Sequence, residues 1–124
     1  MKVLVCGSRG WTRKDLIFDQ LQLLEGEVIV IHGAARGADT HAGEVAEELN
    51  FDVFACPADW KRYGRAAGII RNRQMLDDYQ PELVLAFVRN WGRSPGSRHT
   101  VDLALQRGLD VRVFDEAGPL EVEL

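Results

Sequence analysis

The feature that most constrains this chain is a regular alternation of short aliphatic runs with amphipathic segments. Continuous β-branched and aliphatic runs without polar alternation are typical of strands that helices cover on both faces. Five such runs occur, at 2–6, 28–32, 51–56, 83–88 and 111–114. Because helical patterns separate them, we predict an α/β fold with a doubly wound parallel sheet of about five strands and helices on both faces.

Four segments between these runs carry helical patterns, at 12–25, 40–49, 66–79 and 100–107. Thr12 and Asp15 have the spacing of a capping box at the start of the first helix. The third helix is expected to stop before Pro81, because the residue that precedes a proline is biased away from helical geometry. The tail after Asp115 carries no periodic pattern and is expected to be irregular.

The length and composition favour one globular domain over residues 1–124. Hydrophobic residues make up 46% of the chain and charged residues 27%, which argues against intrinsic disorder. The first apolar run ends at Cys6, too early for a signal peptide or a membrane span. The cysteines also lack metal-binding spacing. We therefore expect a cytoplasmic protein with no membrane attachment, no metal and no cofactor.

Charge is unevenly distributed along the chain. The net charge is −4, which disfavours a protein that coats nucleic acid through bulk electrostatics. Between Trp60 and Thr100, however, eight Lys and Arg residues stand against three Asp and Glu residues. A cationic segment in an acidic protein suggests a discrete anionic ligand, and a solvated arginine face without a ligand is the alternative.

Each unusual motif directly follows a predicted strand. The motifs are GSRGW, GAARGAD, PADWKRYG and RNWGRSPGSRHT, after the first four strands in turn. In open parallel sheets, ligands bind outside the carboxyl ends of the strands, near the point where strand order reverses. The four loops are therefore expected to form one binding site.

The first two loops supply small residues and two arginines. The first is expected to approach a ligand through Gly7, Ser8 and Arg9. In the second, Gly33 and Gly37 would let backbone N–H groups face an anion at the positive end of the next helix. Arg36 would add charge there, and Asp39 would cap the helix or orient Arg36 or a sugar hydroxyl. A plain strand-to-helix turn is an equally good explanation of the first loop alone. The pattern of the second loop is weak evidence by itself, because it lacks the Gly-Lys-Ser or Gly-Lys-Thr of a triphosphate loop.

The fourth loop has the composition of a phosphate cradle at a helix N-terminus. Its candidate ligand-binding residues are Gly96, Ser97, Arg98, His99 and Thr100. His99 would act as a donor or an acid, or would simply lie on the surface.

The third helix and its approach add further candidates. Arg71 can bind a phosphate with its guanidinium group, beside Asn72, or can form an ion pair with Asp77 or Asp78. Two aromatic side chains would either stack on a base or cover the core, namely Trp60 and Tyr63.

Four blocks of sequence resemble the SLOG superfamily, and within it the YspA/YpsA-related branch. They are GSRGW, HGAARGADTHA, PADWKRYGRAAGIIRNRQM and PGSRHTVDLALQRG, and together they cover nearly the whole chain. Other members include the lonely-guy phosphoribohydrolases and the DNA-processing protein Smf/DprA. The resemblance implies a Rossmann-like fold with a nucleotide or nucleotide-derived ligand at the C-terminal edge of the sheet.

The resemblance to lonely-guy enzymes also implies catalytic candidates. Arg71, four residues before Met75, matches their catalytic arginine, and the phosphate motif matches at Pro95, Gly96 and Thr100. The motif's glutamate is replaced by Leu103, and the nearest carboxylate is Asp102, about 100° away around a helix. Cleavage of an N-glycosidic bond requires a placed carboxylate, so the resemblance implies Arg71 and Asp102 for that reaction.

Three functions remain open from the sequence. The first is a nucleotide-binding protein, with or without hydrolysis of the N-glycosidic bond of a nucleoside 5′-monophosphate. The second is a sensor or sponge that binds a nucleotide signal without turnover. The third is single-stranded DNA binding, with Trp60, Tyr63 and Trp91 stacking on bases, which the acidic balance disfavours. Lonely-guy relatives further imply a homodimer.

Overall fold

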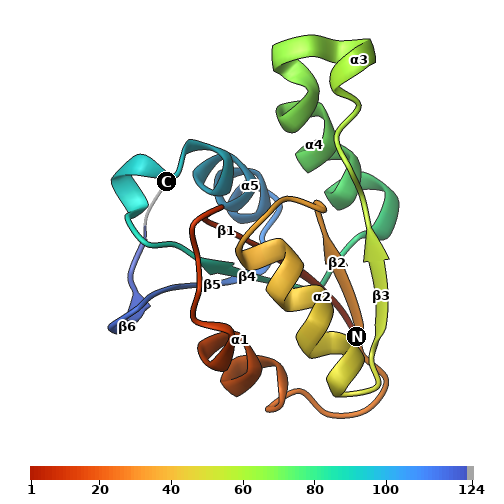
Figure 1. Ribbon diagram of the computed structural model, residues 1–124. Helices are drawn as coiled ribbons and strands as arrows, with labels where there is room; N and C mark the ends of the chain where they lie inside the picture. The colour runs from red at the N-terminus through yellow and green to blue at the C-terminus, as the bar shows by residue number, and fades with distance from the viewer. Residues whose placement is uncertain (123–124) are drawn as a thin grey trace.

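The computed structural model describes residues 1–122, in which six strands form one sheet with helices on both faces (Figure 1). The strands are β1 (Lys2–Gly7), β2 (Ile29–His32), β3 (Asp52–Ala55), β4 (Leu83–Phe87), β5 (Asp110–Asp115) and β6 (Gly118–Leu120). Their order is β3-β2-β1-β4-β5-β6, and β1 to β5 are parallel. The predicted Rossmann-like α/β fold is confirmed, and strand order reverses between β1 and β4.

The sixth strand corrects the expectation of an irregular tail. The carboxylate of Asp115 accepts hydrogen bonds from the amides of Ala117 and Gly118, at 2.7 and 3.1 Å, and this closes a turn. The chain then runs back antiparallel to β5, with Leu120 opposite Val113. An Asp followed by Gly three residues later is turn chemistry, which a search for hydrophobic periodicity does not detect.

Two layers of helices cover the sheet. Helices α1 (Lys14–Leu21) and α2 (Ala38–Glu48) pack on one face, and α4 (Ala67–Tyr79) and α5 (Pro95–Gln106) pack on the other. Alternate residues of β1 serve the two layers, because successive strand side chains point to opposite faces. Val3 and Val5 lie in the α1/α2 core, and Leu4 and Cys6 lie in the α4/α5 core.

Two helix starts differ from the sequence expectation. No capping box forms at α1, because its N-cap is Arg13 and the carboxylate of Asp15 pairs instead with the Arg13 guanidinium at 2.8 Å. Helix α5 begins at Pro95, five residues before the expected start, because proline is well suited to the first helical position. His99 and Thr100 therefore lie in the second turn of α5, and the first turn contains Gly96 and Ser97.

Short helical segments lie in the loops at the carboxyl ends of the strands. They are α3 (Trp60–Tyr63), η1 (Gly64–Ala66) and η2 (Trp91–Arg93). In Figure 1, α3 and the first turns of α4 extend beyond the sheet, next to the end of the edge strand β3. No helix within residues 1–122 has the length and apolar character needed to span a membrane.

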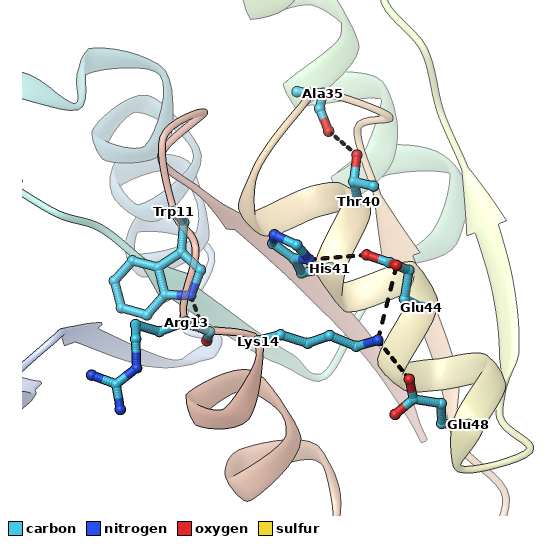
Figure 2. A network of polar contacts seen from close by, with 8 residues as sticks. All are labelled: Trp11, Arg13, Lys14, Ala35, Thr40, His41, Glu44 and Glu48. Atoms are coloured by element: carbon cyan, nitrogen blue, oxygen red, sulfur yellow. Dashed lines mark hydrogen bonds and ion pairs between the residues drawn. The ribbon is translucent and has the colours of Figure 1, made fainter.

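A surface network joins the start of α1 to the second half of α2 (Figure 2). The Lys14 ammonium contacts the carboxylates of Glu48 at 2.5 Å and Glu44 at 3.9 Å. At the start of α2, the Thr40 hydroxyl donates a separate hydrogen bond to the carbonyl of Ala35 at 2.8 Å. That bond holds the end of the β2–α2 loop against its helix.

Candidate functional site

The site is built where β1 and β4 separate, at the reversal of strand order. Gly7 ends β1, and a side chain there would place its Cβ only 2.1 Å from the Phe87 carbonyl oxygen. Ser8 follows, and its hydroxyl accepts a hydrogen bond from the Arg89 amide at 2.9 Å and lies 3.3 Å from the Ser94 hydroxyl. Ser8 therefore holds the β1 and β4 loops together.

The β2–α2 loop packs directly on the β1 loop. Gly37 has a φ of +75°, and a Cβ there would lie 2.3 Å from the Ser8 carbonyl oxygen. That same oxygen accepts a hydrogen bond from the Ala38 amide at 3.1 Å. Glycine at 37 thus permits a close contact between two of the predicted site loops.

Asp39 organises the β2–α2 loop from inside. It lies in the first turn of α2, only 6% exposed, and its Oδ2 accepts hydrogen bonds from the amides of Gly33 and Ala35 at 3.1 and 3.2 Å. The Ala34 amide donates to Nδ1 of His32 at 3.0 Å. These three amides are already paired within the protein, whereas the amides of Arg36 and Gly37 in the same loop have no recorded acceptor within residues 1–122. Asp39 also does not cap the helix, since the N-cap of α2 is Gly37 without a side-chain bond.

Burial raises the pKa of the Asp39 carboxyl to about 6. The amides of Ala35 and Gly33 and the guanidinium groups of Arg71 and Arg9 act in the opposite direction but do not cancel the desolvation. Both recorded hydrogen bonds end on Oδ2, and no fully buried side-chain oxygen in residues 1–122 lacks a partner. Oδ1 is therefore accessible from the cavity described below.

Arg71 reaches from α4 to the ends of two strands. Its Nη1 donates to the carbonyl oxygen of Gly33 and lies 3.5 Å from that of Cys56, while its Nε donates to Oδ1 of Asn72 at 3.0 Å. The alternative ion pair with Asp77 does not form, because Asp77 pairs with Arg107 at 2.7 Å. Burial lowers the pKa of Arg71, and Asp39 opposes that shift.

Asn72 links α4 to the start of α5. It is buried, and its Nδ2 lies 3.4 Å both from the Gly96 carbonyl oxygen and from Nδ1 of His99. The Thr100 hydroxyl donates to the same carbonyl at 3.3 Å. Burial lowers the pKa of His99, which favours the neutral ring near Asn72. These contacts fix the first turn of α5 next to Arg71.

That first turn offers unpaired donors. Within residues 1–122, the structure records no acceptor for the amides of Gly96 and Ser97. Ser97 as a residue is 6% exposed, and its hydroxyl, which has no recorded hydrogen-bond partner in the same range, is not fully buried. Free amides at the positive end of a helix, beside a hydroxyl, are suited to an anion.

Three cavities open along this edge of the sheet. The Trp60 cavity, of about 440 Å³, is lined by Arg9, Gly33, Ala34, Ala35, Arg36, Pro57, Ala58, Trp60 and Arg71. The Ser94 cavity, of about 570 Å³, is lined by Gly7, Ser8, Arg9, Gly10, Arg89, Arg93, Ser94, Pro95, Gly96 and Ser97. Between them, the central cavity of about 100 Å³ is lined by Cys6, Gly7, Arg9, Ala35, Asp39, Arg71, Asn72, Met75, Gly96, Ser97 and Thr100. Arg9 lines all three.

Most of the predicted site residues meet at these cavities. The structure brings Arg36 and Arg71 to the Trp60 cavity, and Arg71 and Gly96 to the central cavity. Five predicted residues line none of the three cavities: Gly37, Tyr63, Arg98, His99 and Asp102. Tyr63 lies under the Arg62 guanidinium at 5.1 Å, and Arg98 lies over Trp91 at 5.8 Å.

The sequence interpretation missed three polar residues of the Ser94 cavity, namely Arg89, Arg93 and Ser94. All follow β4 and precede α5, so they belong to a loop that was singled out. The sequence interpretation favoured the end of this loop that resembles a phosphate cradle, at residues 96–100. These residues could have been identified from their position in the loop after β4, because ligands bind where strand order reverses and the β1 and β4 loops face each other there.

Comparisons with known proteins agree with the family resemblance and the fold. The model of the YspA, cpYpsA-related SLOG family matches residues 1–63. The gene 61 protein of Mycobacterium phage D29 is 35% identical in sequence, and the match covers 93% of this chain and 97% of that protein. DNA processing protein A (DprA) from Streptococcus pneumoniae has a similar X-ray structure, with a TM-score of 0.72 and 25% identity over 92% of this chain. The chain spans 49% of DprA, about half its length.

Proposed function

This chain belongs to the YspA, cpYpsA-related SLOG family, and we propose that it binds a nucleotide or nucleotide-derived ligand at the carboxyl edge of its sheet. The observation that carries the proposal is the central cavity. Arg9, Arg71 and the first turn of α5 all line it, and each of them also lines one or both of the adjoining cavities. Guanidinium groups and free helix amides are donors that recognise phosphate, and the adjoining Trp60 offers a face for a base.

Isothermal titration with adenosine 5′-monophosphate and adenosine tests this proposal. We expect the monophosphate to bind at least about tenfold more tightly, because charge-assisted hydrogen bonds contribute roughly 1.5–3 kcal/mol each. Arg71→Ala should remove most of that difference. Arg65→Ala is a matched control, since Arg65 is an exposed arginine that lines none of the three cavities. Equal affinity for the two compounds would contradict the proposal.

A second candidate function is hydrolysis of the N-glycosidic bond, and Asp39 favours it. In that reaction water adds to C1′ and loses a proton, while the base leaves with the bonding electrons and gains a proton. A carboxyl group with a pKa of about 6 can accept the first proton near neutral pH. Asp39 lies on the wall of the central cavity, whereas Asp102 is on α5 and outside the three cavities. The glutamate position of the lonely-guy motif holds Leu103, packed in the α4/α5 core.

Chromatography of a nucleoside monophosphate incubated with the protein separates hydrolysis from passive binding. If the protein is a hydrolase, we expect free base and ribose 5-phosphate in equal amounts, and loss of both with Asp39→Asn. Retention of activity in Asp39→Asn together with its loss in Asp102→Asn would assign the carboxylate to Asp102. If the protein binds the nucleotide but releases no free base, the result supports a sensor or sponge that binds a nucleotide signal without turnover.

Single-stranded DNA binding is the remaining candidate, favoured by the similarity to DprA and by the exposed side chain of Trp60. Trp60 is 52% exposed, whereas Trp91 is partly buried against the α4/α5 core and lies under Arg98. Binding of this kind should weaken steeply as salt is added, because phosphate contacts release counterions. Affinity for a thymidine oligonucleotide that is insensitive to salt would exclude it.

A further inference from the structure

We propose that the ligand carries two phosphate groups separated by a sugar, with one phosphate in the Trp60 cavity and the other in the Ser94 cavity. This rests on the proposed nucleotide-binding function and specifies the class of nucleotide. Compounds of this class include nucleoside 3′,5′-bisphosphates. A ligand of this class differs from a nucleoside monophosphate or diphosphate, in which the negative charge is concentrated at one end of the molecule.

The distribution of positive charge is suited to two separated anions. Three guanidinium groups line the Trp60 cavity, from Arg9, Arg36 and Arg71, and no carboxylate of the described residues lines it. The Ser94 cavity likewise has three, from Arg9, Arg89 and Arg93, again without a carboxylate. A single phosphate can occupy one cavity and leaves the arginines of the other uncompensated.

Few of these charges are neutralised within the protein. Within residues 1–122, Arg9, Arg36 and Arg93 form no recorded ion pair. The one ion pair of Arg89 is with Glu116, at 3.5 Å between exposed side chains. Exposed pairs of this kind contribute little and are easily exchanged for a ligand.

The first turn of α5 adds neutral donors to the Ser94 cavity. Gly96 and Ser97 line this cavity together with Arg93, and they also line the central cavity. Within the described part of the chain, their amides have no recorded acceptor and the Ser97 hydroxyl has no recorded partner. No fully buried side-chain oxygen in that range is unsatisfied, so the hydroxyl is accessible and can bond to a phosphate oxygen.

The central cavity indicates what joins the two phosphates. At about 100 Å³ it is much smaller than the cavities on either side of it, of about 440 and 570 Å³. Asp39 and Asn72 both line it, and Oδ1 of Asp39 has no recorded hydrogen bond within residues 1–122. A carboxylate oxygen accepts a hydrogen bond from a hydroxyl, so a sugar hydroxyl between the two phosphates suits this space.

Titration calorimetry with three adenosine nucleotides tests the proposal. Adenosine 3′,5′-bisphosphate and adenosine 5′-diphosphate each have two phosphates, separated by the sugar in the first and adjacent in the second. We expect the bisphosphate to bind at least tenfold more tightly than either the diphosphate or the 5′-monophosphate. Equal or tighter binding of the diphosphate would overturn the two-cavity proposal.

Variants in the two outer cavities add a second readout. Arg36→Ala and Arg93→Ala remove exposed side chains, so the fold is retained. Both variants should bind the bisphosphate about tenfold more weakly than wild type does. One of them should still bind the monophosphate with an affinity within about twofold of wild type. Arg65→Ala should affect neither ligand. If both variants weaken both ligands alike, or neither weakens the bisphosphate, the proposal fails.

The two proposals fail in different ways. Monophosphate binding that depends on Arg71, without any gain from a second separated phosphate, would overturn the two-cavity proposal alone. Absence of binding by all three nucleotides would overturn the proposed nucleotide function as well.

Discussion

Arg71 donates a hydrogen bond from its Nη1 to the carbonyl oxygen of Gly33, a residue 38 positions earlier in the chain. This contact joins α4 to the end of β2. It also places the guanidinium group next to Asp39, whose Oδ2 is bonded to the amide of the same glycine. The positive and negative groups of the central cavity therefore share one backbone residue as their support.

Gly33→Ala should disrupt both groups at once. An added Cβ would lie 2.6 Å from Nη1 of Arg71 and 3.0 Å from Oδ2 of Asp39. We expect a loss of about 1–3 kcal/mol in the free energy of unfolding, the usual cost of overpacking. Urea unfolding measures it. Gly68→Ala is the control, because its Cβ would meet only Trp60 at 3.5 Å and alanine favours a helix. Equal urea midpoints for the two variants would contradict this support role.

The sequence sufficed for much of the fold, because buried parallel strands appear as continuous aliphatic runs. It also placed Arg36, Arg71 and Gly96 on one edge, since the carboxyl ends of parallel strands meet there. It could not place the start of α5, because Pro95 fits a loop as well as a first helical turn. Nor could it show that Asp39 bonds backwards to Gly33 and Ala35, since capping and loop-bonding aspartates occupy the same position in sequence.

Asp39 should make stability depend on pH. Its folded pKa of about 6 lies above the ordinary value of 3.8, so the folded protein binds more protons between about pH 4 and about pH 6. The free energy of unfolding contributed by this group therefore falls as pH rises through that window, by about 2–3 kcal/mol. Asp39→Asn should remove this slope and be more stable than wild type at pH 7.

The comparison of wild type with Asp39→Asn isolates this group. Burial and Arg71 lower the pKa of the nearby His32, which makes its own contribution fall as pH decreases. His32 is present in both proteins, so its effect cancels in the difference. Chemical denaturation at several pH values gives that difference, and parallel stability curves for the two proteins would refute the buried-carboxylate account.

Ser8 and Ser97 should respond differently to alanine substitution. The Ser8 hydroxyl accepts the Arg89 amide at 2.9 Å, so Ser8→Ala should cost about 1 kcal/mol of unfolding free energy. Ser97 has no recorded hydroxyl partner within residues 1–122, so Ser97→Ala should change stability by less than about 0.5 kcal/mol while weakening nucleotide binding. Thermal unfolding combined with calorimetry distinguishes the two. A stability loss in Ser97→Ala that matches Ser8→Ala would show a structural hydroxyl instead.

The central claim is that the cavities at the reversal of strand order bind the phosphate of a nucleotide. Nuclear magnetic resonance of the ¹⁵N-labelled protein, titrated with adenosine 5′-monophosphate, tests it most directly. We predict saturable shifts of the Gly96 and Ser97 amides and of the Arg9 and Arg71 side-chain Nε–H groups, with much smaller shifts for adenosine. Shifts confined to other surfaces, or of equal size with both compounds, would contradict the claim.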